Sequence, residues 1–277
     1  MFSISLNGWD FNSVHNGCRW MSSIQNTYDL FNGLPNNLDT SQNIFTGGYY
    51  RNIPTYGGKT FTLTGYIAGP SESQIIQTVD QFKRLLSLDA MILDFTVGEL
   101  KRYMNVYVSY NGLKVSYAGA RLISFSLPLV SLDGYTYGSQ LTYTTGLPSS
   151  TGGMLFPFTF DNLIYSENVS NGIMRINYAG SIPSPLKLVV SNVSNPTISV
   201  YPSNKTMSLN YTVTNSKKII IDSTNKTILL SNGNNLYNSA VSCNWLYLQP
   251  GMNYVTFKSP VYNSLARLTA SFVEVFE

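Results

Sequence analysis

The stretch Gly58-Lys59-Thr60-Phe61-Thr62-Leu63-Thr64-Gly65-Tyr66 decides the fold of this chain. Its threonines alternate with Phe61 and Leu63, so one side of the segment is apolar and the other is polar. Strict alternation is typical of a half-buried β-strand, because successive side chains of a strand point to opposite faces. The stretch therefore predicts a strand in a β-rich N-terminal domain.

One helix is predicted directly after this strand, over residues 72–88. Ser71 and Gln74 form a Ser-x-x-Gln capping box at its start. Apolar residues then recur at spacings of three and four, which places them on one face. These residues are Ile75, Ile76, Val79, Phe82, Leu85 and Leu86. The sequence offers no second helix of comparable quality, so the rest of the chain is expected to be β.

The four segments after the helix are predicted strands, at 91–97, 101–110, 113–117 and 120–131. Asn111-Gly112 lies between the second and third of them and predicts a tight hairpin. In the fourth segment, apolar residues alternate with Ser and Pro, which indicates one buried face.

A change of composition at residues 146–153 predicts a domain junction, because this stretch is uncharged and rich in Gly, Ser and Thr. The predicted domains are therefore 1–145 and 154–277. The second holds short alternating segments separated by turn residues, which is typical of a β-sandwich or barrel. The predicted fold class is mainly β.

The composition excludes several classes of protein. Only 11% of the 277 residues are charged, against a usual figure of about 25%, so long charged helices and coiled coils are excluded. Runs of Lys or Arg never exceed two residues, unlike the basic patches of nucleic-acid binders. A single His and two Cys make a metal centre or disulfide scaffold implausible, and no cofactor is expected. The absence of a long apolar run predicts no membrane span, and the start lacks a signal-peptide pattern, which predicts synthesis in the cytoplasm.

The sequence contains no clear pattern of catalytic residues. His15 is the sole imidazole, and a satisfied loop histidine is its ordinary interpretation. The carboxylates are scattered, so a β-sandwich glycosidase with a paired acid and base is a third-ranked hypothesis. Aromatic residues remain: Trp245 and Tyr247 are candidates for sugar stacking or protein docking, against the alternative that they belong to the core.

Three features taken in order resemble the distal tail protein of siphophages. They are the strand Gly58–Gly65, the helix followed by Met91–Phe95, and a C-terminal series. That series runs through Asn195-Pro196-Thr197-Ile198, Ile219–Ser223 and Leu248-Gln249-Pro250-Gly251. The resemblance spans nearly the whole chain. It implies a tail-tube-like split β-barrel with one flanking helix, followed by a galectin-like or carbohydrate-module-like β-sandwich.

The resemblance also implies a function, which is structural and needs no catalytic residue. Six copies would form a homohexameric ring around the DNA channel, with DNA only as a passenger. The ring would join the tail tube protein to the tail tip and dock receptor-binding proteins or a tail-associated lysin. The protein would be made in the host cytoplasm and would lie at the distal end of the tail in the virion. The alternative is a carbohydrate-binding adhesion module.

Candidate contact residues follow from the same resemblance. Residues 32–58 occupy the place of the family's inter-subunit arm, with the aromatic candidates Phe45, Tyr49, Tyr50 and Tyr56. Candidates to face the channel or a neighbouring subunit are Lys101, Arg102 and Lys114. A surface largely covered by neighbours would also account for the low charge and the 20 Tyr residues of the chain.

Overall fold

In the computed structural model the chain folds into two compact units, Met1–Gly138 with Phe276–Glu277, and Ser139–Val275. Each unit has a hydrophobic core of its own. The division falls inside strand β14 (Thr136–Thr145), and the predicted boundaries at 1–145 and 154–277 stay a prediction. The structure describes residues 2–23, 58–86, 89–109, 112–148, 172–214 and 217–277 in full, and only the backbone of the strand residues 36–37, 40–42, 49–51, 55–56, 149–151 and 167–169.

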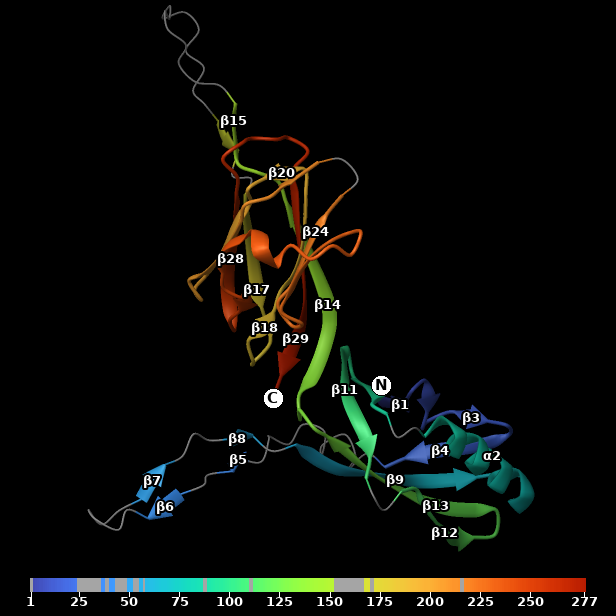
Figure 1. Cartoon of the computed structure of the whole chain (residues 1–277). Coiled ribbons are helices and arrows are strands. Elements are labelled where there is room, and N and C mark those ends of the chain that lie inside the picture. The colour runs from blue at the N-terminus through green and yellow to red at the C-terminus, as the bar shows by residue number, and fades with distance from the viewer. Residues whose placement is uncertain are drawn as a thin grey trace, which may run out of the picture. The chain divides into compact units, whose positions relative to one another are not determined.

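Among its described residues, the first unit is a set of antiparallel strands with one helix (Figure 1). Its strands are β1 (Phe2–Leu6), β2 (Trp9–Asp10), β3 (Val14–His15), β4 (Cys18–Ser22), β9 (Lys59–Ala68), β10 (Met91–Val97), β11 (Leu100–Val108), β12 (Lys114–Gly119) and β13 (Leu122–Ser131). Short strands also lie between β4 and β9, namely β5 (Asn36–Asn37), β6 (Thr40–Gln42), β7 (Tyr49–Arg51) and β8 (Thr55–Tyr56). β9 lies between β4 and β13, while β10 pairs with β1 and β11.

Strand β9 is the predicted strand, extended by two residues to Ala68. Phe61, Leu63 and Ile67 are buried, as the alternation requires. Gly65 lies opposite Phe125 of β13. A Cβ atom at Gly65 would lie 2.6 Å from the Phe125 ring and would also collide with the backbone oxygen of Met21. Glycine is therefore needed here so that an aromatic ring can lie directly over the backbone.

Helix α2 (Glu72–Leu85) begins as predicted but ends earlier than residue 88. The Ser71 side chain accepts a hydrogen bond from the Gln74 backbone N–H at 3.3 Å. Leu86 already has an extended backbone. The predicted apolar face is also too wide: Ile75, Val79 and Phe82 are buried, whereas Ile76 is 60% exposed and Leu85 is 39% exposed.

The core of the first unit is aromatic where the helix meets the sheet. Phe82 of α2 packs its ring 5.2 Å from that of Trp20 and 5.4 Å from that of Phe11. Phe125 lies 5.1 Å from Trp20, and Trp9 closes the group at 5.5 Å from Phe82. Such offset and edge-to-face pairs add to the gain from burial alone, so this group fixes α2 on the sheet.

Asn111 of the predicted hairpin lies outside the described residues, and the described strands β11 and β12 do not pair with each other. β12 pairs with β13 instead, from Lys114 opposite Ser126 to Gly119 opposite Leu122. The turn between these two strands contains Arg121 with a positive φ of 62°. β11 pairs with β10, β13 and, at Tyr103, with β14. A favourable turn dipeptide fixes a change of direction but not the strand with which the chain then pairs.

The second unit is a β-sandwich. One sheet has the order β25-β24-β19-β29 and continues to β14, and the other has the order β17-β28-β21-β22-β26. The strands are β15 (Ser149–Thr151), β16 (Glu167–Val169), β17 (Ile173–Tyr178), β18 (Ser184–Pro185), β19 (Lys187–Ser191), β20 (Val193–Ser194), β21 (Thr197–Tyr201), β22 (Lys205–Leu209), β23 (Thr212–Val213), β24 (Ile219–Asp222), β25 (Thr227–Leu230), β26 (Ala240–Cys243), β27 (Tyr247–Leu248), β28 (Gly251–Lys258) and β29 (Arg267–Phe276). A 3-10 turn, η2 (Tyr237–Ser239), lies between β25 and β26.

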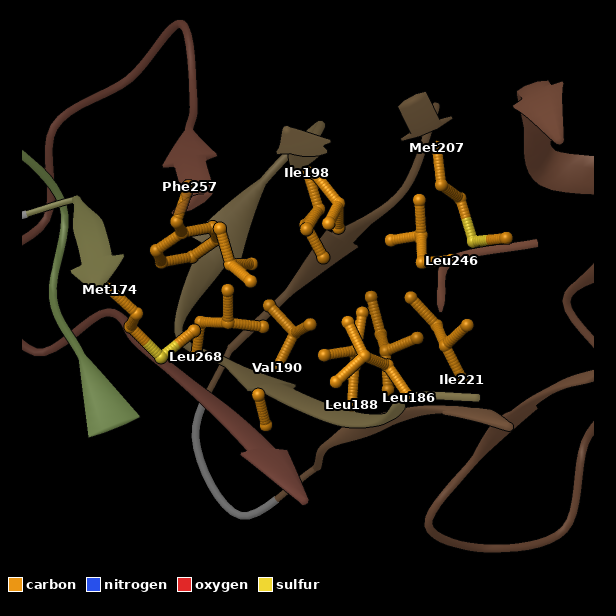
Figure 2. Packing of buried hydrophobic residues seen from close by; sticks show 14 of the residues in the cluster. Met174, Leu186, Leu188, Val190, Ile198, Met207, Ile221, Leu246, Phe257 and Leu268 are labelled. Atoms are coloured by element: carbon orange, nitrogen blue, oxygen red, sulfur yellow. The ribbon is translucent and has the colours of Figure 1, made fainter. Parts of the chain in front are cut away.

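The sandwich core lies between these two sheets. Figure 2 shows Leu188 and Val190 of β19 pointing toward Ile198 of β21 and Phe257 of β28. All four side chains are buried. The predicted mainly β fold with a C-terminal sandwich is therefore confirmed. Among the described strands the pairing of the first unit stays open and does not close the expected split barrel into a ring of strands.

Candidate assembly surfaces

An exposed edge strand is the most prominent surface feature of the first unit. β12 pairs with β13 on one side, and no other described strand pairs with it. None of its six residues is buried, and Tyr117 is 75% exposed. An unpaired edge presents backbone N–H and C=O groups that can pair with another chain. This strand can therefore accept a partner through both its backbone and its side chains.

A hollow of about 200 Å³ lies beside this edge, between α2, β12 and the start of β13. Ile75 and Ile76 line it from the helix, and Tyr117, Leu122 and Ile123 line it from the strands. We call this group, together with Val115 of β12, the helix–edge surface. Its only charged lining residues are Glu72 and Arg121. Exposed apolar side chains around a hollow are typical of a contact surface rather than of a free monomer face.

The three predicted channel-facing cations lie in different environments. Lys114 is exposed at the start of β12, and Lys101 is exposed on β11. Arg102 is instead partly buried: its guanidinium carbon lies 3.6 Å from the centre of the Phe276 ring, and one of its nitrogens donates to the Thr136 hydroxyl at 3.5 Å. The structure does not bring the three together as one cationic patch, and their role toward a neighbour stays a prediction.

A tyrosine pair lies next to Arg102, at the start of β14. Tyr103 and Tyr137 stack with their ring centres 5.2 Å apart. The Tyr137 hydroxyl donates to the Asp133 carboxylate at 2.7 Å. Burial and this hydrogen bond raise the pKa of Tyr137 well above its usual range, so the hydroxyl stays a protonated donor. This arrangement holds β14 to β11 and contains no reactive group.

The predicted arm lies largely outside the fully described residues. The backbone at Tyr49 and Tyr50 belongs to β7, which pairs with β6, and that at Tyr56 belongs to β8, which pairs with β5. Phe45 lies outside the described residues. Two-stranded ribbons are marginally stable in isolation, which agrees with a segment that acts against another surface. The arm stays a prediction.

The aromatic candidates of the second unit are not grouped on an open platform. Trp245 packs against the sandwich core, and its ring centre lies 6.4 Å from that of Tyr237. Tyr247 is partly buried on β27, opposite Pro185. For Trp245, a place at the edge of the core therefore fits the structure better than a role in stacking on sugars. Their role in docking is untested.

The ionisable side chain of His15 is held by local contacts. His15 stacks on Trp9 at 3.9 Å, and its Nε2 lies 2.7 Å from the Asp10 carbonyl and 2.8 Å from the Ser13 hydroxyl. The only imidazole is thus held by its own loop. Within the described ranges no three His, Cys, Asp or Glu residues cluster as metal ligands. No helix in those ranges is long and apolar enough to span a membrane.

Sequence reasoning missed two central residues of the helix–edge surface. Ile76 was expected on the buried face of the helix, and Tyr117 was expected only as the end of a strand. Helical spacing could not separate Ile76 from Ile75, because the two are adjacent on the same stripe. The exposure of Tyr117 depends on β12 being an edge, which only strand order decides.

Comparison with protein families finds a match for most of the second unit. Residues 179–276 match the family model described as the siphovirus-type tail component, C-terminal domain. No curated protein sequence matches the chain. The expected resemblance to siphophage tail components is therefore confirmed for this unit by sequence, and that family is structural rather than enzymatic.

Comparison of folds extends this result to the whole chain. The fold is similar to that of SPP1 Dit, described as a paradigm of the hub adsorption apparatus in phages that infect Gram-positive bacteria, with a TM-score of 0.67, 12% identity and 100% of each chain covered. It is also similar to a chain of the phage P2 baseplate in its activated conformation with calcium, with a TM-score of 0.51, 10% identity and 98% of each chain covered. The chain thus shares the fold of these two proteins over nearly its whole length.

Proposed function

We propose that six copies of this chain form a ring hub at the distal end of a siphovirus tail. The ring joins the tail tube protein to the tail tip and docks receptor-binding proteins or a tail-associated lysin, and DNA passes through its channel. The match of residues 179–276 to the tail-component family carries this proposal. The shared fold over the full length of SPP1 Dit supports it for the first unit.

The helix–edge surface supports assembly as the mode of action. An exposed edge with apolar side chains is an aggregation hazard on a monomer. In a closed ring every copy meets the same neighbour, so a hazardous edge is covered in each subunit and the assembly stops at a fixed size. We infer that β12 and the hollow beside it contact the adjacent copy.

The composition of this surface fits a contact between copies. The cores of protein interfaces are depleted in charge and enriched in tyrosine, and here Tyr117, Ile76 and Leu122 stand together with few charges. Burying the exposed three quarters of the Tyr117 side chain would contribute roughly 3 kcal/mol, from about 25 cal/mol per Å² over a typical tyrosine area. A lysine at this position would both lose that gain and bring a charge into the contact.

The test is the mass of the purified full chain in sedimentation equilibrium. The wild type is expected at about six times its 30.8 kDa, and Tyr117→Lys is expected to shift the population toward single chains. Val241→Lys is the matched control, because Val241 is 76% exposed and belongs to the second unit, whereas the helix–edge surface belongs to the first. A wild type that stays monomeric at high concentration, alone and with tail tube protein, would overturn the ring. A Tyr117→Lys ring equal to wild type would instead overturn only the assigned surface.

A further inference from the structure

The outer face of the sheet β17-β28-β21-β22-β26 carries a row of large polar side chains across three strands. Arg175 of β17 lies opposite Tyr254 of β28, and Tyr254 lies opposite Tyr201 of β21. Residues opposite one another on one sheet face have Cβ atoms about 5 Å apart. The buried neighbours Met174 and Val255 point into the core, so Arg175 and Tyr254 point outward. β17 and β28 lie side by side in Figure 1.

The two tyrosines of this row form an aromatic platform in which Tyr201 is exposed and Tyr254 is partly buried. Tyr201 is 58% exposed. Its ring centre lies 6.3 Å from that of Tyr254, and the ring planes are inclined by 46°. An exposed tyrosine offers an apolar ring face together with a polar tip. A sugar ring has the matching chemistry, with apolar C–H faces and hydroxyl groups around its rim.

Hydroxyl groups continue the platform along the same face. Ser199 and Thr206 lie 2.9 Å apart through their hydroxyl oxygens, and Thr197 and Ser208 lie 3.2 Å apart. Each hydroxyl can donate one hydrogen bond and accept two, so these pairs keep capacity for a further partner. Ile173 of β17 and Met252 of β28 are also exposed on this face, at 49% and 50%, on either side of the Arg175–Tyr254 pair. Tyrosine rings beside rows of hydroxyl groups fit a saccharide, which presents C–H faces and hydroxyl groups together.

The charged side chains on this face are all positive. Arg175 and Lys258 are exposed on it, and the five strands contain no Asp or Glu. Within the described part of the chain, Arg175 has no hydrogen-bond or ion-pair partner. A guanidinium binds a carboxylate with two parallel hydrogen bonds, and aromatic rings on either side of the ligand restrict its orientation.

We propose that this face of the second unit binds an acidic polysaccharide, in which sugar rings stack on Tyr201 and Tyr254 while their carboxylate groups pair with Arg175. The site is distinct from Trp245 and Tyr247, which lie outside these five strands. The proposal does not rest on ring formation, since one unit contains all three residues. In a tail hub it would hold the particle on an acidic surface glycan.

The experiment measures binding of polygalacturonate oligosaccharides to the full chain by isothermal titration calorimetry. Arg175→Ala and Tyr201→Ala are each expected to raise the Kd at least tenfold, and Kd is expected to rise when NaCl increases from about 50 to 500 mM. The matched controls are Lys218→Ala, an exposed cation of the other sheet region, and Tyr237→Ala, an exposed tyrosine elsewhere in the unit. Both controls are expected to keep the wild-type Kd.

Two further ligands test whether binding needs the sugar rings, the carboxylates or both. Poly-glutamate carries carboxylates without sugar rings, and maltoheptaose carries sugar rings without carboxylates. Binding of either as tightly as polygalacturonate would overturn the proposal, as would absence of polygalacturonate binding. A Tyr201→Ala protein with wild-type affinity would also overturn it, and its exposed position makes misfolding a poor explanation. Binding can be measured whether the protein is a single chain or a ring. A negative binding result would therefore not contradict the proposed ring.

Discussion

Replacing Phe82 by alanine tests whether α2 is fixed to the first unit by its aromatic core. The Phe82 side chain is fully buried, at 0% exposure. Its ring lies between 5.2 and 5.5 Å from those of Trp9, Phe11 and Trp20. The substitution removes these contacts and leaves a cavity that three large rings cannot easily fill.

The expected loss of unfolding free energy can be estimated from that packing. Phe→Ala substitutions in cores cost about 3–5 kcal/mol, and aromatic pairs add about 0.5–1.5 kcal/mol each beyond their buried area. The Phe→Ala range already includes such pairs, so three of them place the expected loss in the free energy of unfolding of the first unit at its upper end, about 4–5 kcal/mol. For a unit of this size that is a fall in Tm of roughly 10–20 °C.

The assay is urea unfolding of the full chain, followed by tryptophan fluorescence and circular dichroism. Trp9 and Trp20 report on the first unit and Trp245 on the second. Because each unit has its own core, their transitions are fitted separately. Phe82→Ala is expected to move only the transition of the first unit to lower urea.

The control variant is Ile76→Ala, on the same helix but 60% exposed. It is expected to cost less than about 1 kcal/mol when measured at submicromolar concentration, where assembly stabilises the fold least. Equal losses for Phe82→Ala and Ile76→Ala would refute the packing of α2, because the inner and outer faces of the helix would then be indistinguishable. A loss under about 1 kcal/mol for Phe82→Ala would refute it as well.

Two other substitutions probe the sheets of the two units. Gly65→Ala is expected to lower the unfolding free energy of the first unit by more than about 2 kcal/mol, because its Cβ would lie 2.6 Å from the Phe125 ring. Gly119→Ala is the control, because a Cβ there meets nothing within 4 Å. Equal falls in Tm for the two variants would contradict this. At the β24–β25 turn, burial alone would raise the pKa of Asp222, but hydrogen bonds from Asn225 and Thr224 outweigh it and hold that pKa below 3.8. The resulting stability is present above pH 3.8 and is lost as the pH falls through the lower pKa of the folded state. Asp222→Asn should therefore cost about 1 kcal/mol at pH 7 and less at pH 3, and an equal loss in urea titrations at both pH values would contradict the assignment.

Local patterns predicted individual elements well. The alternation in β9 and β10, and the Ser71 cap of α2, depend on residues adjacent in sequence, so the sequence alone could place them. The end of α2 was missed because apolar spacing continues through Leu86, and no glycine marks the stop. Arg121 similarly takes a positive φ that its side chain does not signal.

The candidate sites required information that no local pattern contains. The helix–edge surface exists because β12 returns to β13 rather than to β11. The Arg175–Tyr254–Tyr201 row joins three strands that are far apart in the sequence, and a shift of one residue in either register would turn Tyr254 toward the core. Composition indicated that tyrosine would serve at contacts, but strand order and register decide which tyrosines do so.

The most direct test of the hub assignment is electron microscopy of the purified full chain in negative stain. The account predicts rings with six-fold symmetry, present alone or after addition of the tail tube protein, and fewer of them for Tyr117→Lys. Particles the size of a single chain under both conditions, across the accessible concentration range, would contradict it.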